Sequence, residues 1–207
     1  VISSREALSL PELPEHVVVV GGGYIGLELG ITYKMLGSDV TIVEAEDSIL
    51  PIFDKELRRP LELFVKKNKI KVNTGVFAKG VEDTKDGKTK LFFIDKNAKE
   101  GTKPEEILAD KILVTVGRKP NSDALKPTGV ALNERGFVKV NNRCETNMKG
   151  VYAIGDVCDS GEMLAHVASF QGEMVAEIIS GKKRAYDPVA VPAIVFTEPE
   201  IVSVGLS

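Results

Sequence analysis

Residues 16–30 read HVVVVGGGYIGLELG, and this stretch decides the fold of the chain. Residues 16–21 form a continuous apolar run of the β-branched kind, which is typical of a parallel strand covered on both faces. Over residues 23–36 the apolar side chains return at helical spacing, and Gly37 ends the predicted helix. A second apolar strand follows over residues 39–44. A strand, a helix and a strand in this order predict a βαβ unit within a parallel sheet.

The rest of the chain predicts an α/β protein in which a β-meander joins the parallel sheet. A helix is expected over residues 54–67, where Asp54 is a candidate N-cap and Pro60 predicts a kink or a later start. Lys85, Asp86 and Gly87 indicate a hairpin, and residues 95–104 an exposed loop. A third helix is expected over residues 163–180, closed by Gly181. Further strands are predicted over residues 71–73, 76–82, 88–94, 109–116, 137–140, 151–154, 193–196 and 201–204.

Length, composition and charge limit the class of protein. The chain has 207 residues, which predicts one or two domains. Hydrophobic residues make up 43% and charged residues 28%, which excludes wholesale disorder. The net charge of −3 offers no basic excess for nucleic acid or an anionic membrane. The longest apolar runs are too short to span a bilayer, and residues 1–14 lack the apolar core of a signal peptide.

Cysteine and histidine usage gives no sign of a metal site. Cys144 and Cys158 are the two cysteines, and neither belongs to a Cys-x-x-Cys motif. We therefore expect two unpaired thiols in a reducing compartment. His16 and His166 do not stand at ligand spacing from a cysteine pair, so no structural zinc site is predicted.

The glycines that follow the first strand form the strongest functional motif. They fit G-x-G-x-x-G between a predicted strand and a predicted helix, as in dinucleotide-binding βαβ units. Gly21 permits a tight turn, Gly23 lets the backbone approach a pyrophosphate, and Gly26 lets the helix pack against the strand. The N–H groups at the start of the helix attract phosphate. The alternative is a tight turn that holds no ligand.

Glu44 ends the next strand, 23 residues beyond Gly21. Its carboxylate can accept hydrogen bonds from the 2′-OH of an adenosine ribose and would repel a 2′-phosphate. Residues 45–47 contain no arginine to hold that phosphate, so NAD is expected rather than NADP. A surface glutamate is the alternative at this position. For Glu28, in the predicted helix, the residues alone favour an acid that complements the helix dipole.

Four motifs in this order resemble the flavin-dependent pyridine nucleotide-disulfide reductases. They are VVVVGGGYIGLELG, TVGRKPN, VYAIGDV and MLAHVASFQG, at residues 17–30, 115–121, 151–157 and 163–172. Within that family the likeness is greatest to the dihydrolipoamide dehydrogenases. It covers the whole chain but only the middle of a family chain, so we expect a fragment. The family's redox Cys-x4-Cys pair and catalytic His-Glu pair have no counterpart here, so no catalytic residue is assigned.

The resemblance implies site residues for two cofactors. It places Glu28 near the nicotinamide, paired with a lysine outside this chain, while Val76 lines the adenine and Gly117 adjoins the nicotinamide half. The implied NAD residues are Gly21, Gly22, Gly23, Tyr24, Ile25, Gly26, Leu27, Glu28, Glu44, Val76 and Gly117. The implied FAD residues are Asp156, Met163, Leu164, Ala165 and His166. From the sequence alone, Asp156 also fits a plain turn, and His166 an ordinary helical histidine.

The resemblance also implies a reaction and partners. The whole enzyme would oxidise dihydrolipoyl groups in 2-oxo acid dehydrogenase complexes, pass electrons through a disulfide and FAD to NAD+, act as a homodimer, and lie in the cytoplasm or the mitochondrial matrix. We expect this chain to be inactive by itself. The alternatives are a mercuric, glutathione or coenzyme A disulfide reductase, or a non-catalytic NAD-binding module. The implied parts are a crossover at residues 1–14, an NAD-binding domain at 15–121, part of the FAD-binding domain at 122–190 and the start of an interface domain at 191–207.

Overall fold

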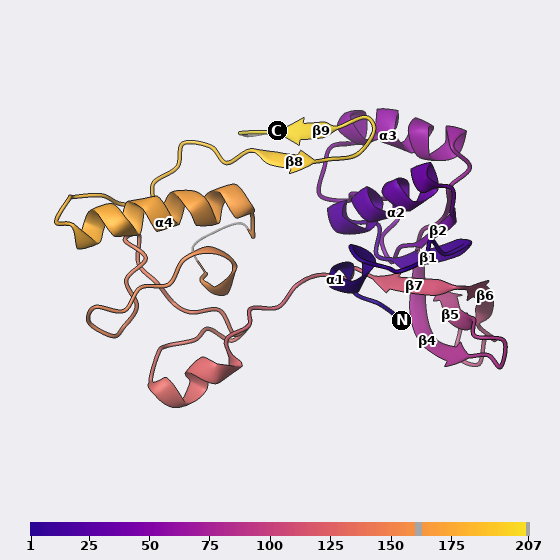
Figure 1. Cartoon of the computed structure of the whole chain (residues 1–207), viewed down its shortest axis with the longest axis horizontal. Coiled ribbons are helices and arrows are strands. Elements are labelled where there is room, and N and C mark those ends of the chain that lie inside the picture. The colour runs from indigo at the N-terminus through magenta and orange to yellow at the C-terminus, as the bar shows by residue number, and fades with distance from the viewer. Residues whose placement is uncertain (160–162, 206–207) are drawn as a thin grey trace. The chain divides into compact units, whose positions relative to one another are not determined.

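The structure is a computed structural model that describes residues 1–159 and 163–205. Its chain divides into two compact units. Figure 1 labels the helices and strands and colours the chain by residue number. The first unit contains Val1–Gly117 and Ile194–Ser203, and the second contains Arg118–Ala193. Within the described ranges, no helix is both long enough and apolar enough to cross a membrane.

A four-stranded parallel sheet forms the centre of the first unit. Its strands are β1 (His16–Val20), β2 (Asp39–Val43), β3 (Lys71–Asn73) and β7 (Lys111–Val114), in the order β3-β2-β1-β7. All three neighbouring pairs are parallel, and Val18 of β1 lies opposite Thr41 and Ile112. The predicted α/β fold with a parallel sheet is confirmed.

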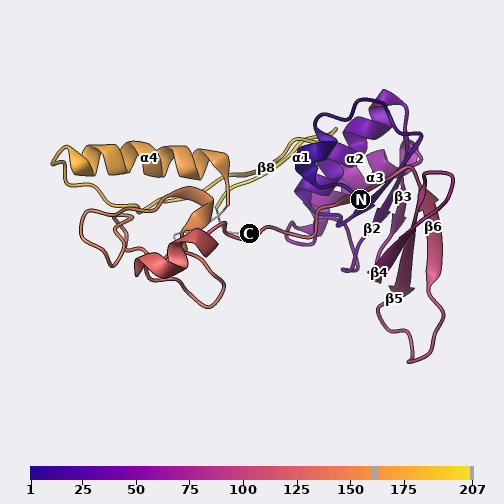
Figure 2. The same cartoon turned by 60° about the horizontal axis from the view of Figure 1, so that its bottom comes forward.

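Both faces of this sheet are covered, as the apolar run in β1 predicts. Helices α2 (Tyr24–Leu36) and α3 (Lys55–Lys67) lie on one face, and the antiparallel meander of β4 (Val76–Asp83), β5 (Thr89–Asp95) and β6 (Glu105–Ala109) lies on the other (Figures 1 and 2). Side chains alternate across a strand. Val19 therefore faces α2, whereas Val18 and Val20 pack with Leu91 and Phe93 of the meander.

Local signals explain where the helices begin and end. Gly23 is the N-cap of α2, and Gly37 ends it in the left-handed conformation at φ 117°. Helix α3 begins at Lys55, after Asp54 at the N-cap position, and continues through Pro60. A short helix α1 (Ser4–Ala7), which the sequence analysis missed, begins with a capping box between the N-cap Ser3 and Glu6.

The predicted strand over residues 109–116 is wrong at both ends. Ala109 is the last residue of β6, and β7 ends at Val114. Asp110 separates the two strands because its backbone and side chain both bind the start of β1. Its carboxylate accepts the N–H of His16 at 2.7 Å, and its own N–H donates to the carbonyl of His16 at 3.0 Å. This corner carries the chain from the meander into the parallel sheet.

The second unit contains little extended structure. It holds the 3₁₀ helices η1 (Asp123–Thr128) and η2 (Gly155–Val157) and the helix α4 (Ala165–Ile179). The strands predicted over residues 137–140 and 151–154 are wrong, since the structure has only isolated bridges there, at Val138 and Tyr152. A turn with a glycine at positive φ precedes each of these stretches, Gly136 before the first and Gly150 before the second. These turns limit how far the pairing can extend. The strands β8 (Ala193–Val195) and β9 (Ile201–Ser203) pair with each other, and apart from Ala193 they belong to the first unit.

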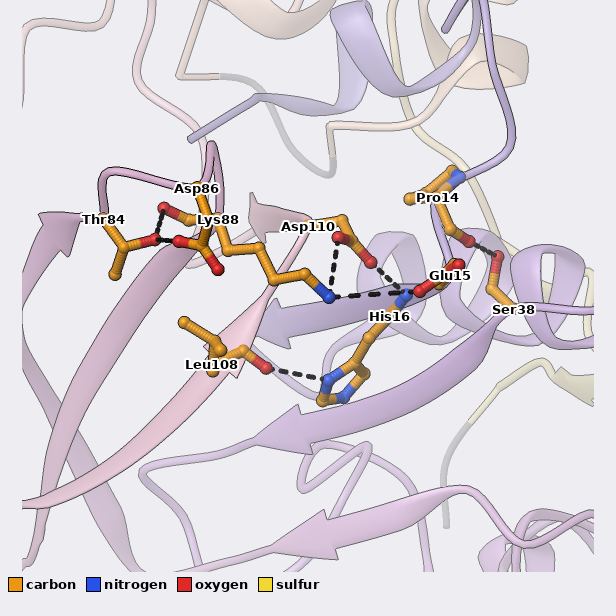
Figure 3. Close-up of polar contacts among 9 residues, drawn as sticks. All are labelled: Pro14, Glu15, His16, Ser38, Thr84, Asp86, Lys88, Leu108 and Asp110. Carbon is orange, nitrogen blue, oxygen red and sulfur yellow. Dashed lines mark hydrogen bonds and ion pairs between the residues drawn. The ribbon is translucent and has the colours of Figure 1, made fainter.

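Polar groups at the amino ends of the parallel strands satisfy one another (Figure 3). Besides the Asp110 corner, His16 places Nδ1 2.9 Å from the carbonyl of Leu108 and Nε2 3.0 Å from the hydroxyl of Thr41. The ammonium of Lys88 lies 3.4 Å from the carboxylate of Asp110. Burial raises the pKa of Asp110, but the His16 N–H and Lys88 outweigh it, so this pKa lies below its ordinary value of 3.8.

Candidate nucleotide-binding site

The glycine motif forms a tight turn at the carboxyl end of β1. Gly21 has φ 106°, and its N–H donates to the carbonyl of Val43 at 2.9 Å. A Cβ atom at position 21 would lie 2.8 Å from the carbonyl oxygen of Thr115. Both the left-handed backbone and this close approach require glycine.

Gly26 and Gly23 serve this turn in different ways. A Cβ atom on Gly26 would lie 2.1 Å from the carbonyl oxygen of Gly21. Helix α2 therefore packs too closely on the turn for any side chain at residue 26. A Cβ atom on Gly23 would meet nothing within 4 Å. Gly23 is the N-cap of α2 and offers no side chain to the N–H groups of the first turn. Those groups are available to an anion in the open space beside Gly23.

Glu44 lies beside this turn and fixes it. One carboxylate oxygen accepts the N–H of Gly22 at 2.5 Å, and the other accepts the N–H of Glu46 at 2.7 Å. The residue is 8% exposed, so the alternative of a surface glutamate is wrong. A carboxylate has about four lone-pair sites, and these two bonds leave acceptor capacity for ribose hydroxyls. The fit to a ribose is therefore good.

Val76 and Gly117 lie at the same edge of the sheet. Val76 begins β4, and its N–H donates to the carbonyl of Glu44 at 3.0 Å, which places the expected adenine and ribose residues next to each other. Gly117 follows β7 at φ 112°, and a Cβ atom there would meet nothing within 4 Å. This edge is where ligands bind in open α/β sheets.

Glu28 lies in α2 beyond its first turn, which contains no acidic residue. The interaction of a charge with the helix dipole falls off within that turn, so the dipole explanation for Glu28 loses its basis. Instead, the Glu28 carboxylate accepts the N–H of Phe196 at 2.9 Å. The carboxylate thus ties α2 to the hairpin formed by β8 and β9.

Thr115 is a residue of this site that the sequence analysis missed. Its hydroxyl lies 3.1 Å from the carbonyl of Val20 and 3.0 Å from that of Gly21, so this residue, which directly follows β7, binds the turn. The signal was a hydroxyl residue at the carboxyl end of a predicted parallel strand.

A second candidate site lies in the other unit, around η2. The carboxylate of Asp156 accepts a hydrogen bond from the guanidinium of Arg118, and its second oxygen keeps acceptor capacity for a ligand hydroxyl. Gly155 has φ 67°, and a Cβ atom there would lie 2.9 Å from the side chain of Ala168 on α4. Glycine is therefore required where α4 packs on the turn that carries Asp156.

Gln171 supports that turn from α4. It is 1% exposed, and its side-chain oxygen accepts the N–H of Gly155 at 2.7 Å. The sequence analysis did not assign it. The signal was a polar residue between Val167 and Met174 on the apolar face of a helix, because a buried amide needs a partner.

The residues expected at the flavin's pyrimidine edge surround the start of α4. Leu164 is the N-cap residue and Ala165 begins the helix, so both lie where helical N–H groups lack intrahelical partners. Ala165 and His166 are exposed, and Met163 is half-buried. The free N–H groups suit a group that gains negative charge.

Both cysteines are buried in the second unit. Cys144 packs with Met174, Val175 and Ile178, and burial raises the pKa of its thiol to about 11. This thiol stays protonated at neutral pH, which keeps its reactivity low. Over residues 1–159 and 163–205, no group of three or more His, Cys, Asp or Glu side chains is arranged to hold a metal ion.

Comparison with known proteins places these features in a family. Residues 1–172 match the family described as pyridine nucleotide-disulphide oxidoreductase. The dihydrolipoyl dehydrogenase of Pseudomonas aeruginosa is 46% identical over 211 residues, and that of Bacillus subtilis is 42% identical over 208. These alignments cover 100% and 99% of this chain but 43% of each relative. The chain thus spans less than half the length of the curated relatives it matches.

Solved structures agree on the fold. LpdA from Mycobacterium tuberculosis superposes with a TM-score of 0.87 at 28% identity, over 99% of this chain and 43% of that one. The HOCl-induced flavoprotein disulfide reductase RclA from Escherichia coli superposes with a TM-score of 0.86 at 27% identity, over 99% of this chain and 46% of that one. With a family match over residues 1–172 and the glycine turn held by Glu44, the chain belongs to the pyridine nucleotide-disulphide oxidoreductase family.

Proposed function

We propose that the protein containing this chain is a dihydrolipoyl dehydrogenase. The observation that carries the proposal is the glycine turn at the carboxyl edge of the sheet, fixed by the carboxylate of Glu44. Identities of 42% and 46% to two dihydrolipoyl dehydrogenases support that branch of the family. In the reaction, a dihydrolipoyl dithiol loses two electrons and two protons to become a disulfide, and NAD+ gains a hydride while one proton is released.

On this proposal the first unit holds NAD. The N–H groups at the start of α2 bind the pyrophosphate, and the Glu44 carboxylate accepts the ribose hydroxyls. Val76 borders the adenine, and Gly117 leaves room for the nicotinamide half. The proposed NAD residues are Gly21, Gly22, Gly23, Tyr24, Ile25, Gly26, Leu27, Glu28, Glu44, Val76 and Gly117.

The second unit holds part of the flavin on the same proposal. FAD, when bound, accepts an electron pair from the dithiol–disulfide couple and delivers a hydride to NAD+. The residues of this chain bind and orient it: the carboxylate of Asp156 accepts a ribityl hydroxyl, and N–H groups at the start of α4 stabilise negative charge on the ring. The proposed residues are Asp156, Met163, Leu164, Ala165 and His166.

The partners and the division into domains belong to the proposal too. A lipoyl-bearing acyltransferase of a 2-oxo acid dehydrogenase complex would supply the dithiol, and the whole enzyme would be a homodimer in the cytoplasm, or in the mitochondrial matrix of a eukaryote. The crossover, the NAD-binding domain, the FAD-binding part and the interface segment would occupy residues 1–14, 15–121, 122–190 and 191–207. Residues outside this chain would supply the redox disulfide, the catalytic base and most dimer contacts.

The NAD assignment is tested by titrating the chain with NADH and NADPH while nicotinamide fluorescence is followed. The chain has no tryptophan, so its own emission is low. We expect saturable NADH binding at least tenfold tighter than NADPH binding, and a roughly tenfold loss of NADH affinity in Glu44→Gln. One charge-assisted hydrogen bond is worth about 1.5–3 kcal/mol, which covers that loss. A preference for NADPH would overturn the assignment.

The proposed activity is tested on the full-length flavoprotein that contains this chain. We expect NADH formation from NAD+ and dihydrolipoamide, and none from this chain alone. RclA, a disulfide reductase of similar fold, favours a second candidate, another flavin disulfide reductase. Reduction of glutathione disulfide, coenzyme A disulfide or Hg²⁺ without dihydrolipoamide oxidation would establish that candidate. A full-length protein that binds NADH but catalyses none of these reactions would be a non-catalytic NAD-binding module.

A further inference from the structure

Lys96 brings a positive charge to the loop that follows Glu44. Along the chain, residues 45–47 contain no arginine and no lysine. In the structure, the ammonium of Lys96, directly after β5, lies 2.6 Å from the carboxylate of Asp47 in that loop. The two residues are 49 positions apart. The sequence next to Glu44 therefore gives no sign of this cation.

Backbone hydrogen bonds fix this corner of the first unit beside the expected ribose site. The N–H of Gly75 donates to the carbonyl of Glu46 at 2.8 Å, and the N–H of Lys96 donates to the carbonyl of Gly75 at 2.8 Å. The N–H of Glu46 donates to the Glu44 carboxylate at 2.7 Å. Glu46 thus binds the expected ribose acid through its N–H and the neighbour of Lys96 through its carbonyl.

The side chain of Lys96 passes over Gly75 to reach the loop. A Cβ atom on Gly75 would lie 3.8 Å from the Cε atom of Lys96 and 3.5 Å from a carboxylate oxygen of Asp47. The side chain of Lys96 is 27% exposed and that of Asp47 is 83% exposed. The ion pair therefore lies at the surface, where an anion from solution can reach the ammonium if Asp47 no longer holds it.

Carboxylates balance the charge of Lys96. The hydrogen bond with Asp47 is the largest influence on the pKa of Lys96 and raises it, burial lowers it, and the charges of Asp47, Glu46 and Asp95 raise it again. The net pKa lies above its ordinary value of 10.5, so the lysine is a cation at neutral pH. Its direct partner is Asp47, and the Asp47 carboxylate occupies the place that another anion would take.

We propose that Asp47 helps to exclude NADPH by holding Lys96 in this ion pair. The inference rests on the proposed NAD site and adds a second determinant of coenzyme choice to the repulsion by Glu44. Lysine binds phosphate as a point charge, and a phosphate monoester carries about −1.5 to −2 charges at pH 7. A free Lys96 would attract the 2′-phosphate of NADPH, whereas a paired Lys96 leaves the repulsion by the carboxylates in place. The uncharged ribose hydroxyls of NADH need no cation.

The test is a titration of Asp47→Asn with NADH and with NADPH, followed by nicotinamide fluorescence at one low ionic strength. Low salt is needed because exposed charges are screened. We expect NADPH to bind Asp47→Asn at least fivefold more tightly than it binds the original chain, while NADH affinity stays within twofold. Surface ion pairs contribute little to stability, so the variant should remain folded, and saturable NADH binding reports this in the same experiment.

Two further variants separate the role of Lys96 from a simple loss of negative charge. In a chain that carries Lys96→Gln, Asp47→Asn should raise NADPH affinity less than twofold, because the cation that would attract the phosphate is missing. Glu82→Gln is the matched control. It removes the same charge from an exposed residue near the other end of β4 and should change NADPH affinity less than twofold.

Two results would overturn this inference alone: an NADPH affinity that Asp47→Asn leaves unchanged, or an equal gain with and without Lys96. In both cases the original chain would still prefer NADH, and the proposed NAD site would stand. A preference of the original chain for NADPH would overturn the NAD assignment and this inference with it.

Discussion

Both ends of the parallel sheet carry polar residues, but the hydrogen bonds of these residues differ. At the amino ends, the groups of His16, Lys88 and Asp110 bind one another or the backbone (Figure 3). At the carboxyl ends, the carboxylate of Glu44 and the hydroxyl of Thr115 bind the backbone of the glycine turn. The first N–H groups of α2 lie beside the open space at Gly23.

This difference separates polar groups that stabilise the fold from polar groups that remain available to a ligand. His16, Lys88 and Asp110 are half-buried, and each is paired with another of these groups or with the backbone. At the carboxyl ends, the helix start keeps unsatisfied donors in a place that water reaches and a phosphate can take. The comparison predicts that mutations at one end change stability alone, while mutations at the other change ligand binding.

The largest expected effect comes from Gly26→Ala. A methyl group there would lie 2.1 Å from the carbonyl oxygen of Gly21, so the helix or the turn must move. Alanine gains about 1 kcal/mol of helix propensity over glycine, but overpacking costs about 1–3 kcal/mol and here falls on rigid backbone. The rigid backbone puts the cost at the upper end of that range, so we expect a net loss of about 2 kcal/mol in urea unfolding and at least a hundredfold loss of NADH affinity.

Gly23→Ala is the matched control for that variant. The added methyl group meets nothing within 4 Å in the protein, and Gly23 has φ −75°, which alanine tolerates. The free energy of unfolding should fall by no more than about 1 kcal/mol, because alanine is a poorer N-cap residue than glycine by about that amount. NADH affinity should fall at least tenfold, since the methyl group occupies the pyrophosphate's approach. Unchanged affinity would show that the pyrophosphate binds elsewhere.

Asp110→Asn tests the amino ends. The amide keeps one acceptor oxygen but loses the charge that faces Lys88 and the N–H of His16. Hydrogen bonds to charged groups are worth about 1.5–3 kcal/mol, and the Asp110 side chain is 23% exposed, so a loss of about 1–2 kcal/mol in urea unfolding is expected. NADH affinity should stay within twofold. A tenfold loss of affinity would contradict the separation of the two ends.

The stability difference between the original chain and Asp110→Asn should depend on pH, because the pKa of Asp110 is lowered in the folded chain. The folded chain binds the Asp110 proton less tightly than the unfolded chain does. The contribution to stability is therefore complete above the ordinary pKa of 3.8 and is lost as the pH falls through the lower, folded value. Urea unfolding of the original chain and of Asp110→Asn should differ by a constant amount from pH 7 to about pH 5. The difference should shrink below about pH 4, and a constant difference down to pH 2 would refute this.

Much of the first unit followed from sequence because its signals are local and repetitive. Runs such as residues 16–20 and the glycines at 21, 23 and 26 fix strand, turn and helix within a few residues. The spacing of Glu44 predicts a ribose-binding acid at the end of the second strand, and the structure places its carboxylate on the N–H of Gly22, a bond that the spacing does not indicate. That bond depends on how the loops after β1 and β2 meet in space, which spacing does not describe.

Prediction was poorer where contacts between distant residues decide the structure. The chain turns at Asp110 because the carboxylate of Asp110 accepts the N–H of His16. The apolar sequence around Asp110 gives no sign of this long-range bond. In the second unit, Val138 and Tyr152 are residue types that favour strands, but each pairs only through isolated bridges. Gln171 and Arg118 support the Asp156 turn from 15 and 38 positions away in sequence, respectively. Such pairings are set by tertiary packing, which overrides local propensity.

One substitution made at both ends of the sheet gives the smallest effect and the sharpest comparison. The hydroxyl of Thr41 hydrogen-bonds to the His16 ring. The hydroxyl of Thr115 donates to the carbonyls of Val20 and Gly21. Valine has nearly the same shape, so Thr41→Val and Thr115→Val should each lower the free energy of unfolding by about 1 kcal/mol, the worth of one hydrogen bond. NADH affinity should distinguish the two variants.

Thr115→Val loosens the turn that positions the first N–H groups of α2 and should weaken NADH binding several-fold, whereas Thr41→Val should change NADH binding less than twofold. Equal effects on affinity would mean that the turn keeps its shape without the Thr115 hydroxyl, through its glycines and the bond from Gly22 to Glu44.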